Sequence, residues 1–150
     1  MVRVMRKELD EALCAKYPEI FRDRNGDMRT TAMCWGFECG DGWYNIIDAA
    51  CAQIQNRLRN LHRYGEYSKH GEGSIRQHPQ VVATQVKEKY GTLRFYYTGG
   101  DEYIEGVIAM AEQMSEVTCE KCGAPGKLQS YGWAYTACDE HTRDEDKENE

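Results

Sequence analysis

Residues 81–97, VVATQVKEKYGTLRFYY, alternate apolar with polar side chains on both sides of Tyr90-Gly91. The side chains expected to face a core are Val82, Thr84, Val86, Leu93, Phe95 and Tyr97. A period of two predicts strands, and Tyr90-Gly91 supplies the tight turn that an antiparallel hairpin needs. Gly99-Gly100 ends the second strand, so the predicted hairpin covers residues 81–98.

Amphipathic helices are predicted before and after this hairpin. The clearest covers 42–63, where apolar side chains recur three or four residues apart behind Asp41, a good N-cap residue. Its apolar positions are Trp43, Ile46, Ile47, Ala50, Cys51, Ile54, Leu58 and Leu61. Similar stripes predict a helix over 3–16 and a third from Asp101 to Met114. This order indicates an α+β fold in which helices pack on a small antiparallel sheet.

The size and composition of the chain suit one domain with a small annex. It has 150 residues, of which 41% are hydrophobic and 29% charged. No apolar run reaches the roughly 20 residues that cross a bilayer, and charges interrupt the N-terminus where a secretory signal would be apolar. We therefore expect a cytoplasmic protein with no membrane partner. Its core domain is expected to cover 1–117, with a mobile, glycine-rich loop over 64–80.

The pattern Cys119-x-x-Cys122-Gly123, followed by Cys138-x-x-His141, predicts a metal site. Two ligand pairs with fifteen residues between them, 123–137, are typical of zinc ribbons. A reducing cytosol also favours thiolate ligands over disulfides. Three thiolates and one imidazole complete a tetrahedral shell, so we expect one structural Zn²⁺ in a ribbon over 118–142. The acidic residues 143–150 are expected to form a disordered tail.

Three motifs, in this order along the chain, resemble a group of small uncharacterised proteins encoded by bacteriophages and prophages. They are Gly40-Asp41-Gly42-Trp43, then Lys87-Glu88-Lys89-Tyr90-Gly91-Thr92-Leu93-Arg94-Phe95-Tyr96, then the Cys119 to His141 pattern with Pro125-Gly126 and Gly132-Trp133 inside it. The resemblance covers residues 30–140 and implies a phage accessory protein acting in the bacterial cytoplasm. Such proteins commonly bind host or defence components. The resemblance therefore implies a non-enzymatic inhibitor or adaptor whose partner is a host or defence protein.

The other side of the predicted hairpin supports an alternative function. Lys87, Lys89, Arg94 and Tyr96 lie opposite the apolar positions and combine cations with a ring on which a base can stack. They predict a nucleic-acid or nucleotide binding module that uses hairpin 81–98. Lysine and arginine are also ordinary on the solvent side of a strand, and the acidic tail would compete for the same patch.

Four further cysteines have weaker patterns. Cys34 and Cys39 can contribute half of a second metal site, but no second ligand pair accompanies them. Cys14 and Cys51 lie on the apolar stripes of predicted helices, where free cysteine behaves as a small hydrophobe. Packing is the default expectation for all four.

Histidines and glycines of the middle region match no catalytic pattern. His62, His70 and His78 recur at a spacing of eight, which suits no metal-binding turn, and Gly71 and Gly73 lack the strand and helix of a phosphate loop. No nucleophile with a neighbouring base and no open metal site can be read from the sequence. An enzyme is therefore the third hypothesis, and the oligomeric state is open.

Overall fold

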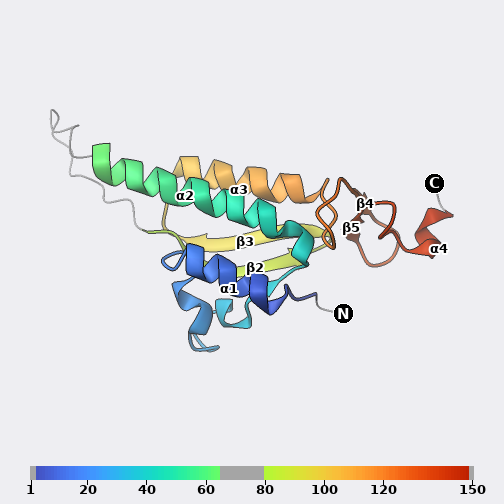
Figure 1. Ribbon diagram of the computed structural model, residues 1–150, viewed down its shortest axis with the longest axis horizontal. Coiled ribbons are helices and arrows are strands. Elements are labelled where there is room, and N and C mark those ends of the chain that lie inside the picture. Colours follow the sequence, from blue (N-terminus) through green and yellow to red (C-terminus); the bar gives the residue numbers. More distant parts are fainter. Residues whose placement is uncertain (1–2, 65–79, 149–150) are drawn as a thin grey trace.

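Two long helices lie side by side over a three-stranded sheet, and a second, two-stranded sheet lies at one end of the molecule (Figure 1). This computed structural model describes residues 3–64 and 80–148. The helices are α1 (Lys7–Lys16), α2 (Tyr44–Tyr64), α3 (Glu102–Ser115) and α4 (Asp144–Lys147). The strands are β1 (Phe37–Glu38), β2 (Val82–Lys89), β3 (Thr92–Thr98), β4 (Lys127–Gln129) and β5 (Tyr135–Ala137). The α+β class is confirmed.

The predicted antiparallel hairpin is present as β2 and β3. Tyr90 and Gly91 both have a positive φ, 54° and 83°, as a type I′ turn requires. The prediction of a purely antiparallel sheet is wrong, because β1 pairs with β2 in parallel. Its two residues lie between glycine-rich turns, so they show no periodicity of their own. They form a strand because β2 offers them a free edge.

The alternation expected along the first strand is interrupted. Ala83 and Val86, three residues apart, face the core with Val81, whereas Thr84 is only half-buried. The cause is a β-bulge, a register shift between Ala83 and Gln85, which adds one residue to β2 and reverses the faces before it. Beyond the bulge, Val86 and its partner Phe95 follow the predicted pattern.

The helices pack on the sheet through their apolar stripes. The expected cap of α3 is confirmed, since the amide of Ile104 donates to the Asp101 carboxylate at 3.1 Å. Asp41 does not cap α2 in this way, because it begins a 3₁₀ turn and accepts the amide of Arg6 at 2.8 Å. The first helix also starts later than expected, since the amide of Met5 donates to Phe37 O and keeps the chain before Lys7 extended.

Two further expectations concern the loop over 64–80 and the absence of a membrane-spanning segment. The expected mobile loop lies, apart from Tyr64 at the end of α2 and Gln80, outside the described residues. The same is true of His70, His78, Gly71 and Gly73. Among the helices that the structure describes, none combines the length and the apolar character needed to cross a bilayer.

The loop before α2 contacts the Cys119–Cys122 turn through two glycines. The amide of Gly42 donates to Glu120 O at 2.7 Å. A Cβ on Gly42 would lie 2.1 Å from Cys119 O, and one on Gly40 would lie 2.3 Å from Glu120 O. Atoms cannot approach so closely, so only glycine permits this contact between the two backbones. The indole of Trp43 adds a hydrogen bond to Thr118 O at 2.9 Å.

The β2–β3 turn makes the second contact with the C-terminal module. The hydroxyl of Thr136 donates to Gly91 O at 2.7 Å. A Cβ on Gly91 would lie 2.6 Å from a methyl carbon of Leu128, so β4 also packs closely over this turn. The β4–β5 hairpin is therefore fixed to the core from two sides, by the loop before α2 and by the β2–β3 turn.

We predict that Gly42→Ala lowers the free energy of unfolding by about 1–3 kcal/mol, because the new methyl group forces two packed backbones apart. Gly106→Ala is the matched control. A Cβ at Gly106 meets nothing within 4 Å, and the helix gains about 1 kcal/mol in propensity. Chemical denaturation of both variants at low micromolar concentration measures the difference. A Gly42→Ala protein as stable as the unmodified chain would contradict the close contact.

Candidate metal centre

The four side chains of the predicted zinc pattern lie together at the end of the molecule. The ligand atoms of Cys119, Cys122, Cys138 and His141 are all within 4.8 Å of one another. Cys119 Sγ is 3.5 Å and Cys138 Sγ 3.3 Å from His141 Nδ1, and the sulfurs of Cys122 and Cys138 are 3.8 Å apart. Such a cluster of three thiols and one imidazole can hold a metal ion.

Two tight turns direct these ligands at one point. In the first, the amide of Gly123 donates to Cys119 O at 2.9 Å, and Gly123 has a φ of +81° that favours glycine. In the second, the amides of His141 and Thr142 donate to Cys138 O at 3.1 and 2.9 Å. Strands β4 and β5 pair between the turns and bring the second pair back to the first.

The environment of Cys119 favours its thiolate. Burial alone would raise the pKa of this thiol. The backbone amides of Cys138, Cys122 and Lys121, together with His141, lower it by more, so the pKa falls to about 6. Since the thiolate is the form that binds metal, this ligand is prepared for an ion at neutral pH. Cys119 is fully buried and Cys122 is exposed, so the site has one inner and one outer edge.

Glu120, between two of the ligands, points into the protein instead of toward the cluster. Its carboxylate accepts the amide of Gly40 at 3.1 Å and the guanidinium of Arg3 at 2.9 Å. Burial raises the pKa of this carboxyl, and these two donors act against the shift. The contact matters for the site because the turn that positions Cys119 and Cys122 also positions Glu120 against the core.

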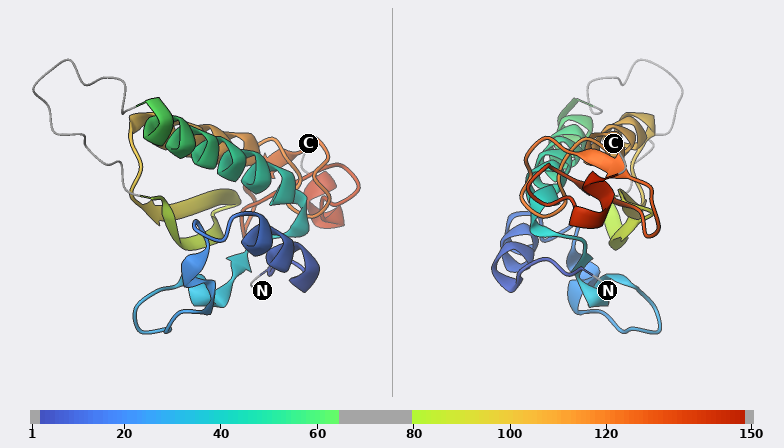
Figure 2. Two further views of the ribbon diagram at one scale, coloured as in Figure 1. Left: turned by 60° about the vertical axis from the view of Figure 1, so that its left-hand side comes forward. Right: turned by 90° about the vertical axis from the view of Figure 1, so that its right-hand side faces the viewer.

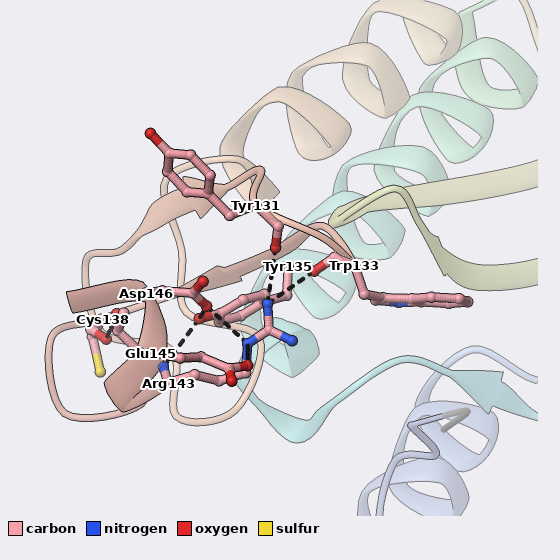
Figure 3. Close-up of polar contacts among 8 residues, drawn as sticks. Tyr131, Trp133, Tyr135, Cys138, Arg143, Glu145 and Asp146 are labelled. Carbon is pink, nitrogen blue, oxygen red and sulfur yellow. Dashed lines mark hydrogen bonds and ion pairs between the residues drawn. The ribbon is translucent and has the colours of Figure 1, made fainter. Parts of the chain in front are cut away.

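The prediction of a disordered tail from residue 143 is wrong for the residues up to 148. Arg143 begins an ordered contact with Tyr135 of β5, and Asp144–Lys147 form α4 (Figure 3). The Tyr135 hydroxyl donates to the Asp146 carboxylate and accepts the amide of Arg143 at 3.0 Å. Asp146 is buried, and Tyr135 and Arg143 hold the pKa of its carboxyl below the usual range.

Arg143 also fixes the loop between β4 and β5. Its Nη2 donates to the carbonyls of Tyr131 and Trp133 at 3.1 and 3.4 Å, and its Nε lies 2.8 Å from the Asp146 carboxylate. The guanidinium carbon lies 4.4 Å from the centre of the Tyr135 ring. Acidic composition predicted a solvated tail. The spacing of Arg143 and Asp146, three residues apart, was the available sign of a helical ion pair.

Three of the other cysteines, Cys14, Cys39 and Cys51, occupy packing positions, whereas the half-buried Cys34 thiol donates to Thr31 O at 3.3 Å. Cys39 and Cys51 are fully buried in the core, and burial raises the pKa of both thiols. Burial, followed by the charge of Asp10, raises the pKa of Cys14 to about 11. These thiols therefore stay protonated and uncharged at neutral pH. Among the described residues, Cys119 and its three neighbours form the one group of Cys, His, Asp and Glu side chains close enough to hold an ion.

The candidate nucleic-acid residues share one face of the sheet. Lys87 pairs directly with Arg94, and Gln85 with Tyr96, while the intervening pair Val86 and Phe95 faces the core. Lys89 lies at the turn, 5.7 Å from the ring of Tyr90. Sequence reasoning missed that β1 adds an acid here. Glu38 pairs with Lys87 from the other side and accepts a hydrogen bond from Gln85 at 3.1 Å.

Comparison of the chain with protein-family models, with curated proteins and with solved structures gave no match. Its chemistry is therefore inferred from the residues themselves.

We predict that protein purified without chelator contains one metal ion per chain, and that Cys138→Ser loosens it, because a serine hydroxyl is a poor substitute for a thiolate. Elemental analysis and a thermal melt with and without chelator measure both effects. Cys34→Ser is the control, since the Cys34 thiol is half-buried outside the cluster and should not affect metal content. A metal content near zero would contradict the site, and a content near two would assign a ligand role to Cys34 and Cys39.

We predict that Tyr135→Phe lowers the free energy of unfolding by about 1–3 kcal/mol, because the buried Asp146 carboxylate loses one of its two partners and keeps only Arg143, and the Arg143 amide loses its acceptor. Tyr131→Phe is the matched control, since this side chain is exposed and its backbone carbonyl, not its hydroxyl, contacts Arg143. Denaturation of the metal-loaded proteins compares the two. Equal effects of the two substitutions would argue against the contact between Tyr135 and the C-terminal helix.

Proposed function

We propose that this chain is a zinc-containing protein that acts without catalysis, by binding a second protein as an inhibitor or adaptor. Zinc suits the ligands: Zn–S bonds of about 2.3 Å and a Zn–N bond of about 2.0 Å place sulfurs about 3.8 Å apart and sulfur and nitrogen about 3.5 Å apart in a tetrahedron. The Cys122–Cys138 and Cys119–His141 distances are 3.8 and 3.5 Å. Four protein ligands fill the tetrahedron, so the ion stabilises a zinc ribbon and has no position for a substrate.

One observation carries the binding role, a group of exposed apolar side chains at the metal-containing end. This aromatic end surface consists of Tyr90 on the β2–β3 turn, Leu128 on β4, and Tyr131 and Trp133 on the β4–β5 loop. Trp133 is 73% exposed. Figure 3 shows the side chains of Tyr131 and Trp133 pointing away from Arg143, to which their carbonyls are bound, and in opposite directions from each other, so they are two separate anchors at this end.

Aromatic side chains on a fixed backbone are typical anchors of protein interfaces. They bury a large area on binding and lose little conformational entropy, so a few of them supply most of the affinity. Zinc and Arg143 fix this loop before a partner arrives, which lowers the cost of association. The resemblance to phage-encoded proteins suggests the class of partner, a host or defence protein of the bacterial cytoplasm.

We predict that Trp133→Ala weakens capture of the partner from bacterial lysate, with a loss of about 2 kcal/mol or about 30-fold in Kd for the purified pair. Trp35→Ala is the matched control, because Trp35 is 57% exposed but lies outside the aromatic end surface. Capture should persist after nuclease treatment and at elevated salt. Equal losses from the two tryptophan substitutions would contradict the assignment of the binding surface.

Binding of nucleic acid or a nucleotide is the second candidate, favoured by the direct pairing of Lys87 with Arg94 beside Tyr96. The acid Glu38 on the same face lowers the positive charge there and makes this the weaker candidate. If this second function holds, nuclease treatment should abolish the capture of a partner from bacterial lysate. Binding to a single-stranded oligonucleotide would then fall steeply with salt and be lost on Tyr96→Ala. That outcome would reverse the order of the two functions.

A further inference from the structure

The sulfur atoms of the candidate metal centre differ in their access to solvent, because the C-terminal module has one side on the core and one side facing away from it (Figure 2). All seven cysteines of the chain lie among the described residues, and Cys122 alone is exposed. Cys138 is half-buried, whereas Cys119 is fully buried. Cys122 and Cys138 line a cleft of about 490 Å³, and Cys119 and His141 lie outside its lining. A small molecule in this cleft therefore meets two of the three sulfurs.

Cys122 and Cys138 are also close to each other. Their sulfur atoms are 3.8 Å apart. At that distance the atoms are in van der Waals contact, and rotation of the two side chains can bring them to the S–S bond length of about 2.0 Å. The pair therefore combines one accessible thiol with a second thiol that is in position to react with it.

Backbone contacts hold Cys119 on the buried side of the cluster. Its amide donates to Ala124 O at 2.8 Å, and its carbonyl accepts the amide of Gly123 at 2.9 Å. The carboxylate of the neighbouring Glu120 accepts the amide of Gly40 at 3.1 Å. Moving the Cys119 sulfur into the cleft would break these contacts. Cys119 is therefore the poorer partner for a disulfide, although its sulfur belongs to the same cluster.

We propose that Cys122 and Cys138 are a redox-sensitive pair that hydrogen peroxide converts into a disulfide, with release of the zinc ion. The inference rests on the zinc ribbon proposed above. The charges that line the cleft favour a neutral oxidant over an anionic one, because there are two acids, Asp139 and Glu140, and one cation, Lys127. Hydrogen peroxide is small and uncharged, so it suits this cleft.

The reaction has two steps. In the first, the Cys122 thiolate attacks one peroxide oxygen, the O–O bond breaks and hydroxide leaves, so that Cys122 becomes a sulfenic acid. In the second, the Cys138 thiolate attacks the Cys122 sulfur, the S–S bond forms, the S–O bond breaks and a second hydroxide leaves. Two protons from solvent convert both hydroxides into water, and the two sulfurs supply the two electrons that reduce the peroxide. Cys119 and His141 are then the remaining ligands, which are too few to hold the ion.

The disulfide replaces the ion as the link between the two turns. It closes residues 123–137 into a covalent ring, which restricts the unfolded chain. Arg143 keeps its hydrogen bonds to the carbonyls of Tyr131 and Trp133, because neither bond involves sulfur. Figure 3 shows Cys138 and Trp133 at opposite sides of the group of residues drawn. Oxidation should therefore release zinc without unfolding the loop that carries the aromatic end surface.

Peroxide treatment of the zinc-loaded full chain tests this inference. A chromophoric chelator should report release of one zinc ion per chain beyond that of an untreated sample, and dithiothreitol with added zinc should restore the bound ion. Peptide mapping of the oxidised protein should find the bond between Cys122 and Cys138. The oxidised, metal-free chain should melt about 5–10 °C above the reduced, metal-free chain, because the disulfide closes a loop.

Cys122→His separates this chemistry from zinc binding. Histidine is a zinc ligand, so the variant should keep its ion in a Cys₂His₂ site, but peroxide should release the ion about tenfold more slowly, because the exposed thiol is gone. Cys34→Ser is the matched control. It also removes one thiol, lies outside the cluster, and should release zinc as the unmodified chain does.

Two outcomes would overturn the inference. One is a mapped disulfide that includes Cys119, or no disulfide at all, after peroxide treatment. The other is release of zinc from Cys122→His as fast as from Cys34→Ser. The mapping needs no variant, so it decides the matter even where Cys122→His fails to bind zinc. Trp133→Ala should form the disulfide normally, so failure of this inference is distinguishable from failure of the proposed function.

Discussion

The close approach of Gly40 and Gly42 to residues 119 and 120 is the constraint on which the rest of the molecule depends. The turn that aims Cys119 and Cys122 at a metal ion also aims the buried Glu120 carboxylate at the Gly40 amide and at Arg3. The conformation of this one turn therefore determines both the position of the metal ligands and the packing of the C-terminal module on the core. A buried carboxylate costs several kcal/mol unless it is paired, so loss of the turn would leave an uncompensated charge in the interface. A metal ion held by this turn would therefore stabilise the junction as well as its own loop.

The C-terminal segment adds a contact of its own to this module. Asp146 is its buried acid, neutralised by Arg143 and hydrogen bonded by Tyr135, whereas Asp144 and Glu145 stay exposed. That contact covers β5 and fixes the loop that carries Trp133. Because this pair is neutral, the net charge of −6 lies on the rest of the chain, and none of the residues that line the groove between α2 and α3 carries any of it.

Local patterns predicted the parts of this fold that repeat along the chain. The 3.6-residue stripe of α2, the period of two along β3 and the paired ligand spacing were all visible, because each depends on residues close in sequence. Strand β1 and the bulge near Ala83 were not visible, and the helix after Arg143 had only the spacing of Arg143 and Asp146 as a sign. The first two depend on distant segments, because β1 needs the edge of β2 and the bulge lies where the Ala83 amide donates to Ile20 O at 2.8 Å. The glycines before α2 were recognised as a motif, but their reason, contact with residues 119 and 120, required the three-dimensional structure.

Exposed apolar side chains gather at two places on the molecule. One is the groove between residues 45–53 of α2 and 103–114 of α3, and the other is the aromatic end surface beside the candidate metal ligands. Arg143 fixes the loop of the second place by donating to the carbonyls of Tyr131 and Trp133. Because side chains on a fixed backbone lose little conformational entropy when they bind, the binding function that we propose rests on this end of the molecule.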